Sequence, residues 1–203
     1  VVRERDTGET CRLRMPLPGR HHLMNALFAV AVGRGHGLGW ADIRAALEAY
    51  RTAPMRWECS RLCGALVVND AYNANPVSMR AALRAFAEQD VPARKWVVLG
   101  GMRELGRLEA EEHEALGRDV AGGPWAGLVT VGRLGGLIAR AAAGLGPDRL
   151  VPCADHAEAA AFLVRSVRPG DAVLFKASRG ERLEDVLNLW ARAAGAAPEP
   201  LVE

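Results

Sequence analysis

The sequence lacks the features that are typical of membrane proteins, nucleic-acid-binding proteins and zinc proteins. Its net charge of +2 at pH 7 is too small to predict binding to nucleic acid through the field of the whole protein. Its longest apolar runs are too short to cross a bilayer, so no membrane insertion is expected. The cysteines form no CxxC pair and have no partners at zinc spacing. We therefore expect a cytosolic protein without a metal site in this chain, in which Cys11, Cys59, Cys63 and Cys153 are reduced and mostly buried.

The usual sequence motifs that bind nucleotide phosphates are missing as well. No GxxxxGK motif followed by Ser or Thr occurs, and no GxGxxG motif lies at a strand–helix turn. The glycines of residues 101–106 and 132–136 only imitate such loops. The chain begins with Val1 rather than an initiator Met, so we expect a piece of a longer protein. If a nucleotide is bound, its phosphates must be held mainly by groups outside this chain.

The most informative stretch present is residues 66–86. An apolar run ends at Asn69-Asp70, a short polar loop follows, and Pro76 opens a segment with the apolar spacing of a helix. The pattern predicts strand, loop and helix, with Asn75 as the helix cap. Asp70 would then lie at the carboxyl end of a strand, where open α/β sheets bind ligands, and could accept two hydrogen bonds from a ribose diol. The alternative is that Asp70 and the asparagines only cap their own loop.

Strand and helix patterns alternate from residue 66 to residue 194. This alternation predicts an α/β fold with a Rossmann-like, mostly parallel sheet and helices on both faces. Residues 56–63 and 65–69 indicate a hairpin around Gly64, which would add one antiparallel strand at the edge. The Ala/Pro/Glu-rich tail from Gly195 is expected to be frayed.

The first fifty residues follow a different pattern. Residues 1–15 alternate polar and apolar side chains, as in an edge strand or a hairpin. Residues 23–32 are apolar almost all round, which predicts a helix buried on most sides. A buried amide must be hydrogen-bonded, so Asn25 within this helix either makes a local bond or contacts a ligand. Residues 42–50 predict a second helix, and Thr52–Pro54 resembles a domain junction.

Several polar side chains are candidates for binding an anionic ligand. Lys176, Ser178 and Arg179 come at the carboxyl end of a predicted strand, a position that suits phosphate or carboxylate. Lys176 stands out because the chain has only one other lysine, Lys95. Arg56 begins a strand near the junction, where it could bind an anion or be an ordinary surface charge.

Three histidines have alternative interpretations. His21 and His22 stand at a helix entrance and could be caps, surface residues or ligand contacts. His113 lies on one helix face with Leu116 and Val120, where a histidine is commonly packed or solvated.

Four segments, in this order, resemble the Mur ligase family of ATP-dependent amide ligases. LPGRHHLMNAL (residues 17–27) is similar to its PGxHNxxNALAA segment, and DAYNANPVSM (70–79) is close to its D(A/S)YNANPxSM loop. LGGMRELG (99–106) resembles its LGDMxELG segment, with His113 at the helix histidine that follows, and FKASR (175–179) resembles VKGSR. The loop is typical of the branch that adds D-alanyl-D-alanine to UDP-N-acetylmuramoyl-tripeptide in peptidoglycan synthesis, and thus serves cell-wall biogenesis, cell shape and cell division.

The resemblance implies an architecture and a reaction. Residues 1–53 would be the helical remnant of a central ATP-binding domain, and residues 54–203 the C-terminal Rossmann-like domain. ATP would phosphorylate the tripeptide carboxylate, and the amine of D-alanyl-D-alanine would attack the acyl phosphate. Mg²⁺ would be held mainly by the missing part of the central domain. The resemblance also implies a monomer, and this fragment alone is expected to be inactive.

The resemblance also implies roles for individual residues. Arg56 and Lys176 would be catalytic, with Arg56 reaching the ATP phosphates. The nucleotide would be bound by His21, His22, Asn25, Arg56, Asp70, Tyr72, Asn73 and Asn75. The acceptor pocket would be formed by Met102, Glu104, Lys176, Ser178 and Arg179.

The chain departs from the family pattern at four positions. His22 replaces Asn, and Gly101 replaces the Asp of LGDM, which removes a carboxylate from the acceptor region. Met55 precedes Arg56 where Gly is common, so the local turn is expected to differ, and Ala177 replaces a Gly of VKGSR. Two alternatives stay open: a sister Mur or folylpolyglutamate-type ligase, and a non-catalytic Rossmann-like binding domain that acts through a partner.

Overall fold

The computed structural model describes residues 1–91 and 93–201, apart from the side chain of His21. The chain divides into two compact units, Val1–Thr52 and Ala53–Glu203. Each unit has its own helices and strands, and they are described separately.

The first unit has a small apolar core. Its elements are β1 (Val2–Arg3), β2 (Thr10–Cys11), α1 (Arg20–Gly35) and α2 (Trp40–Glu48). The two strands pair antiparallel, so of the two alternatives for residues 1–15, an edge strand or a hairpin, the hairpin is the one observed. Val30 of α1 packs against Ile43 and Leu47 of α2.

The prediction that the first helix is buried on most sides is wrong for this chain. The apolar side chains that lie exposed on α1 are Leu23, Met24, Leu27, Phe28 and Val32. Asn25 is exposed too, so its amide is not a buried group that requires a protein partner. The physical reason is that the described neighbours of α1 in this unit cover only the side that carries Val30.

The second unit, as far as it is described, is built on one seven-stranded sheet in the order β7-β6-β5-β8-β4-β3-β9. The strands are β3 (Glu58–Leu62), β4 (Ala65–Asn69), β5 (Lys95–Leu99), β6 (Gly127–Val131), β7 (Leu150–Cys153), β8 (Ala172–Lys176) and β9 (Glu199–Pro200). Strands β4 to β8 run parallel, and β3 runs antiparallel to β4. These strands confirm the predicted fold class.

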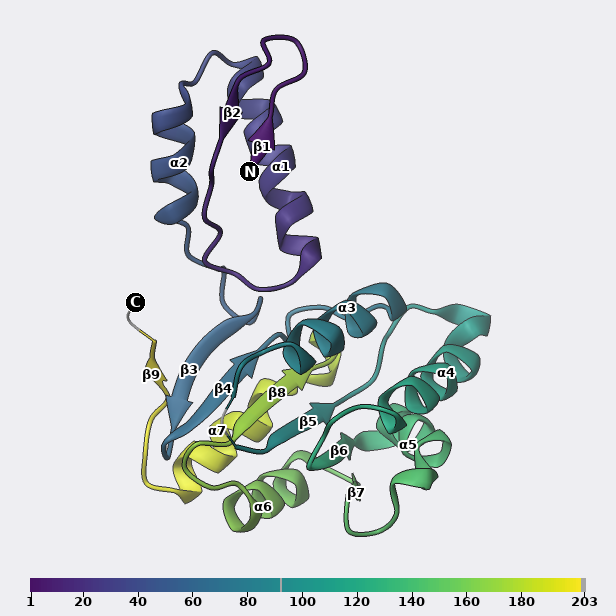
Figure 1. Ribbon diagram of the computed structural model, residues 1–203. Coiled ribbons are helices and arrows are strands. Elements are labelled where there is room, and N and C mark those ends of the chain that lie inside the picture. Colours follow the sequence, from purple (N-terminus) through teal and green to yellow (C-terminus); the bar gives the residue numbers. More distant parts are fainter. Residues whose placement is uncertain (92, 202–203) are drawn as a thin grey trace. The chain divides into compact units, whose positions relative to one another are not determined.

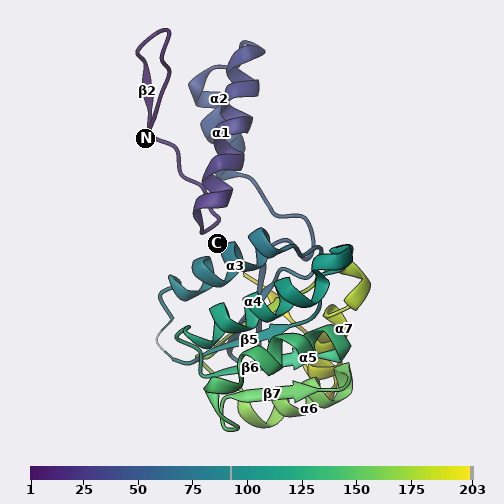
Figure 2. The ribbon, with the colours of Figure 1, turned by 90° about the vertical axis from the view of Figure 1, so that its right-hand side faces the viewer.

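Helices cover both faces of this sheet (Figures 1 and 2). The helices are α3 (Pro76–Ala87), α4 (Glu109–Ala121), α5 (Gly132–Ala141), α6 (His156–Ser166) and α7 (Glu184–Ala193). Helices α3, α4 and α5 lie on one face, and α6 and α7 lie on the other. Alternate residues of each central strand point to opposite faces. Val173 and Phe175 of β8 therefore pack with Leu163 of α6 and Trp190 of α7.

Two details of the antiparallel edge follow from local sequence. Cys63 and Gly64 form the two-residue turn between β3 and β4, with φ of 52° and 77°. Both residues of such a turn need positive φ, which glycine adopts freely. The turn leaves Cys63 exposed, against the expectation of mostly buried thiols. The tail is not wholly frayed, since Glu199 and Pro200 pair with Arg61 and Ser60 of β3.

Gly117 lies where α4 packs tightly against α5. A Cβ atom at Gly117 would lie 2.3 Å from the Ile138 carbonyl oxygen and 2.8 Å from the Ala141 Cβ. We expect Gly117→Ala to lower the free energy of unfolding by about 2 kcal/mol, because the helices must separate to admit the methyl group. Urea denaturation measures this change.

Gly136→Ala in α5 is the matched control, because a Cβ there meets no atom within 4 Å. It is expected to leave stability unchanged or raise it by up to about 1 kcal/mol through better helix propensity. Equal effects of the two substitutions would contradict the close-packing argument.

Candidate functional site

Three loops meet at the carboxyl edge of the second unit. The β4 loop (residues 70–75), the β5 loop (100–105) and the β8 loop (177–183) follow strands that are neighbours in the sheet, with β8 in the middle. The carboxyl ends of parallel strands are the usual ligand-binding edge of an open α/β sheet. The loops carry most of the residues predicted to form a site.

Lys176 joins the β8 strand to the β4 loop. Its side chain is only 3% exposed, and its Nζ donates to Asp70 Oδ2 at 2.6 Å and to the Asn73 carbonyl oxygen at 3.2 Å. The Asp70 carbonyl oxygen lies 3.4 Å from the same nitrogen. An ammonium group has three protons, and here each has an acceptor within the loop. Lys176 is therefore placed to hold the β4 loop in position.

Asp70 is held from two sides. Its Oδ1 accepts a hydrogen bond from the Trp57 backbone N–H at 3.1 Å, while its Oδ2 is paired with Lys176. Its side chain is still 20% exposed, and a carboxylate oxygen can accept more than one hydrogen bond. Asp70 thus has a structural role at this edge and keeps some capacity to accept a bond from a ligand.

The asparagines of the β4 loop cap local backbone groups. Asn73 Oδ1 accepts from the Ala74 N–H at 2.8 Å. Asn75 Oδ1 accepts from the Ser78 N–H at 2.8 Å, and Ser78 Oγ accepts from the Asn75 N–H at 3.0 Å. This reciprocal capping box starts α3 where the sequence placed its first residue. The hypothesis that these asparagines cap their own loop is consistent with this geometry.

Ser178 connects all three loops. Its N–H donates to the Gly101 carbonyl oxygen at 2.9 Å. Its Oγ accepts from the Arg103 N–H at 2.8 Å and lies 3.2 Å from the Ala74 carbonyl oxygen, to which it donates. The buried Ser178 hydroxyl therefore fixes the β4 and β5 loops relative to the β8 loop.

Arg56 lies over the ring of Tyr72. The guanidinium carbon is 4.1 Å from the ring centroid, and the two residues are exposed. The Tyr72 N–H donates to the Met55 carbonyl oxygen at 3.0 Å, which joins this segment to the β4 loop. Met55 has a φ of 58° and Trp57 a φ of 57°. Met55 thus adopts the left-handed backbone that glycine favours, and the expected difference from the family's turn stays a prediction.

The side chain of His113 is hydrogen-bonded to the backbone of the β5 loop. It is fully buried, and its Nε2 accepts the Met102 backbone N–H at 2.8 Å while its Nδ1 lies 2.5 Å from the Glu109 carbonyl oxygen. The backbone N–H must donate, so the ring is neutral and carries its proton on Nδ1. Of the alternatives for His113, the packed one is correct, with a specific partner in the loop.

We expect His113→Leu to lower the free energy of unfolding by about 2 kcal/mol, because the buried Met102 N–H would lose its acceptor. Gln can offer an oxygen to the same N–H, so His113→Gln is expected to lose less. Hydrogen exchange at the Met102 amide should speed up in the leucine variant. Equal stability losses with unchanged exchange at Met102 would contradict this role.

The residues predicted for the acceptor pocket separate into two groups. Met102, Lys176 and Ser178 are buried, at 0%, 2% and 5% exposure, and their polar groups are engaged within the protein. Glu104 is exposed, with a φ of 67°. Arg179 is exposed and pairs with Glu184.

An open pocket of about 550 Å³ lies beside the β5 loop, and we call it the edge pocket. It is lined by Arg103, Glu104, Glu109, Arg133, Leu134 and Glu181. Of the predicted site residues, only Glu104 lines it. Arg133 and Glu181 were not singled out from the sequence, because Arg133 lies among the glycines of residues 132–136, which lack a phosphate-loop pattern, and Glu181 lies beyond the FKASR segment.

Gly101 lies against Leu134. A Cβ atom at Gly101 would lie 2.5 Å from both Cβ and Cδ1 of Leu134. The space that an aspartate side chain would need at this position is therefore filled by an apolar residue of α5.

The nucleotide-binding residues predicted in the first unit belong to α1. Asn25 is exposed and His22 is partly buried. The side chain of His21 lies outside the described part of the structure.

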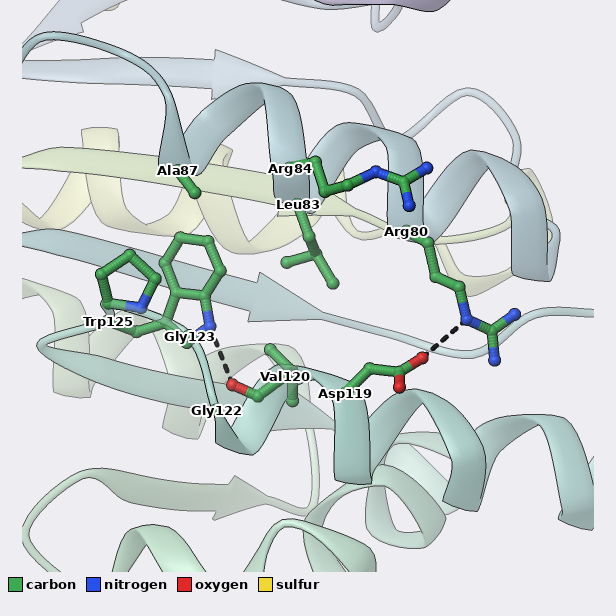
Figure 3. Close-up of a pocket in the computed structure, with 10 residues that line it drawn as sticks. Arg80, Leu83, Arg84, Ala87, Asp119, Val120, Gly122, Gly123 and Trp125 are labelled. Atoms are coloured by element: carbon green, nitrogen blue, oxygen red, sulfur yellow. Dashed lines mark hydrogen bonds and ion pairs between the residues drawn. The ribbon is translucent and has the colours of Figure 1, made fainter.

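A second hollow, of about 440 Å³, lies between α3 and α4 (Figure 3). Leu83 and Trp125 give it an apolar floor, and Arg80 bridges the two helices by pairing with Asp119 at 2.6 Å. None of the residues predicted to form a site lines it.

The described residues contain neither a cluster of metal ligands nor a membrane-spanning helix. No group of three or more histidine, cysteine, aspartate or glutamate side chains there could hold a metal ion. No helix in that part of the chain is long and apolar enough to cross a membrane.

Comparison with known proteins identifies the family. The family model described as Mur ligase, glutamate ligase domain matches residues 55–179, which include the β4 and β5 loops and the first three residues of the β8 loop. The chain belongs to the Mur ligase family.

Two curated relatives carry the name of one branch of the family. The chain is 34% identical over 175 residues to the UDP-N-acetylmuramoyl-tripeptide–D-alanyl-D-alanine ligase of Bacillus subtilis, covering 85% of this chain and 38% of that protein. It is 36% identical over 192 residues to the enzyme of the same name from Mycobacterium tuberculosis, covering 84% of this chain. The chain thus spans 38% of the length of these Mur ligases.

Solved structures of Mur ligases share the fold. MurF from Acinetobacter baumannii superposes with a TM-score of 0.80 at 34% identity, over 89% of this chain and 40% of that one. MurF from Thermotoga maritima, solved in complex with ADP, gives a TM-score of 0.72 at 29% identity, over 87% of this chain and 39% of that one. The relatives named as D-alanyl-D-alanine ligases confirm the predicted branch resemblance.

Proposed function

We propose that the protein containing this chain is an ATP-dependent ligase that joins D-alanyl-D-alanine to UDP-N-acetylmuramoyl-tripeptide through an acyl phosphate. The single observation that supports this most is the β4 loop, DAYNANP, fixed at the carboxyl edge by Lys176 and Ser178. The names of the relatives supply the substrates, and the ADP complex of the Thermotoga maritima relative supports use of a nucleotide.

Within this proposal the exposed residues of the carboxyl edge bind the nucleotide. Asp70 accepts hydrogen bonds from the ribose through its exposed part, beside Tyr72 and Asn73. Arg56, whose guanidinium is exposed, binds the phosphates. In the first unit, His21, His22 and Asn25 contact the base.

Other parts of the proposal concern the rest of the protein. Residues 1–53 are the end of the central ATP-binding domain, and Mg²⁺ is bound by parts of that domain outside this chain. The protein is a cytoplasmic monomer. Because these 203 residues contain no phosphate-binding loop, the chain by itself binds ATP weakly or not at all and is inactive.

The test is ADP release by the full-length protein. We expect release only when ATP, UDP-N-acetylmuramoyl-tripeptide and D-alanyl-D-alanine are all present. Release with a free amino acid in place of the dipeptide would instead indicate a sister ligase of the diaminopimelate-adding or folylpolyglutamate type. No release with any acceptor would favour a non-catalytic binding domain. Calorimetry of residues 1–203 with ATP is the companion measurement, and micromolar binding would contradict the proposal that the phosphates are held elsewhere.

A further inference from the structure

We propose that the hollow between α3 and α4 is a binding site for a small monocarboxylate with an aromatic or branched apolar body. Arg84 and Arg80 bind the carboxylate, and the apolar body packs on Leu83 and Trp125. This inference does not depend on the proposed ligase reaction, because none of the residues assigned to that reaction lines the hollow.

The hollow lies at the ends of the two helices that are farther from the carboxyl edge of the sheet. Helix α3 begins directly after the β4 loop, but it lines the hollow only with its second half, from Arg80 to Ala87. Helix α4 contributes its last turn, from Asp119, and the segment that follows it to Trp125 completes the lining. A molecule bound here therefore leaves the carboxyl edge free.

The ring of Trp125 is fixed as part of the floor. Its Nε1 donates to the Val120 carbonyl oxygen at 2.9 Å, and its ring stacks on Phe86 with the centroids 6.0 Å apart. A Cβ atom at Gly123 would clash with the same indole nitrogen, so glycine at this position makes room for the ring. The apolar surface formed with Leu83 is thus preformed, as in typical small-molecule sites.

Arg84 supplies a positive charge that is free to bind an anion. Its side chain is exposed, and no residue in the described part of the chain forms an ion pair or a side-chain hydrogen bond with it. Figure 3 shows its guanidinium extending from α3 toward the Arg80 end of the hollow, away from Trp125. A ligand can therefore place its apolar body over the indole ring and its carboxylate at the other end.

Arg80 lies one turn before Arg84 and has donors to spare. Its Nε donates to Asp119 Oδ2 at 2.6 Å, whereas its Nη1 and Nη2 are each 3.5 Å from Glu112 Oε2, at the limit of a hydrogen bond. A guanidinium has five N–H donors, so Arg80 can bind a second carboxylate while it keeps Asp119.

The charge and the size of the hollow limit the ligand. Arg80 and Arg84 against Asp119 leave one positive charge in excess among the lining residues, which favours a monoanion. The volume of about 440 Å³ is in the range of small-molecule sites. The backbone groups of α3 and α4 are hydrogen-bonded within the helices and offer a peptide main chain few partners, which favours a free acid over the end of a polypeptide.

The test is saturation-transfer NMR of the full-length protein with 4-phenylbutyrate as the probe. We expect saturable binding with a Kd of about 1 mM or lower, which is ordinary for a ligand of this size. The uncharged 4-phenylbutyramide should bind about fivefold more weakly or worse, because it cannot form the charge-assisted hydrogen bonds. Equal binding of acid and amide, or no binding of the acid, would overturn the proposal.

Two substitutions locate the bound probe. Arg84→Met removes the unpaired cation and should raise the Kd about fivefold or more. Ala87 lies beside the Trp125 ring in Figure 3, so Ala87→Leu should fill the space of the apolar body and weaken binding with every charge kept. If neither variant changes the Kd, the probe binds elsewhere and the proposal is wrong.

Arg118→Met is the matched control. Arg118 is exposed on α4 next to Asp119 but does not line the hollow, so this variant should leave the Kd unchanged. An equal rise in both arginine variants would mean that the probe responds only to overall charge, which contradicts a site. The thermal midpoint of each variant should stay at the wild-type value, which separates lost binding from misfolding.

A last comparison tests the choice of a free acid. Acetyl-glycyl-phenylalanine carries the same ring and carboxylate on a peptide main chain, and we expect it to bind more weakly than 4-phenylbutyrate. Tighter binding of the peptide would overturn the free acid as the ligand and indicate the carboxyl end of a partner polypeptide instead.

Discussion

In the full-length protein, replacing Lys176 with Met is expected to lower the free energy of unfolding of the second unit by about 3 kcal/mol and to reduce the turnover of the proposed ligase reaction about a hundredfold or more. The side chain is 3% exposed and pairs with Asp70 at 2.6 Å, so its removal leaves a poorly solvated carboxylate without its cation. The β4 loop also loses the bond to the Asn73 carbonyl oxygen and can move away from its place at the carboxyl edge.

Urea denaturation followed by tryptophan fluorescence measures the loss of stability. The second unit carries four buried tryptophans to report on it: Trp57, Trp96, Trp125 and Trp190. Combining Lys176→Met with Asp70→Asn should cost less than the sum of the single changes, because the two charges are removed together.

Lys95→Met is the natural control, since Lys95 is the only other lysine. Its Nζ donates to the Ala87 and Gln89 carbonyl oxygens, each at 2.6 Å, at the start of β5 rather than at the carboxyl edge. We expect a loss of about 1 kcal/mol and nearly unchanged turnover. If the two lysine variants lose turnover equally, Lys176 does not have the positioning role described here.

Asp171→Asn is expected to lower the free energy of unfolding by about 3 kcal/mol at pH 7. The Asp171 side chain is 2% exposed and lies just before β8. It accepts hydrogen bonds from Arg94 Nη2 at 2.7 Å, the Arg168 N–H at 2.9 Å and Trp96 Nε1 at 3.2 Å. An amide removes the charge and brings an N–H group against these donors.

The stability that Asp171 contributes should depend on pH. Burial by itself raises the pKa of Asp171, but hydrogen bonds from Arg94, the Arg168 backbone and Trp96 outweigh it, and the pKa lies below its ordinary value. A carboxyl group with a lowered pKa in the folded state stabilises the fold above its unfolded pKa of about 4, and this contribution is lost as the pH falls further. The difference in unfolding free energy between wild type and Asp171→Asn should therefore become smaller as the pH falls below about 4.

Unfolding free energies measured at pH 7 and about pH 3 test this dependence. The exposed Asp148 lies in a turn, and Asp148→Asn is expected to change stability by less than about 0.5 kcal/mol at either pH. A wild-type advantage over Asp171→Asn that is the same at both pH values would contradict the role assigned to the Asp171 charge.

Local patterns and motifs in the sequence were enough to predict the elements of the second unit and the family. The apolar run to Asn69, the cap at Asn75 and the proline at position 76 specified strand, loop and helix, and the structure confirms all three. The hairpin around Gly64 and the alternation of strands and helices were also predicted from the sequence, and the structure contains both. These features are local: side-chain periods of two and 3.6 residues, turn residues and caps act over a few neighbouring positions.

Which of these residues meet depends on the order of the strands in the sheet, which became known with the structure. Lys176 pairs with a carboxylate 106 residues earlier because β8 inserts between β4 and β5, and local periodicity carries no information on strand order. The same insertion lets Ser178 connect the three loops through hydrogen bonds. The edge pocket is lined by Arg103, Arg133 and Glu181, among others, and these residues do not belong to one sequence motif. The prediction that α1 is buried was wrong for a related reason. An apolar pattern shows which face of a helix is suited to burial, but it does not show which element packs on that face.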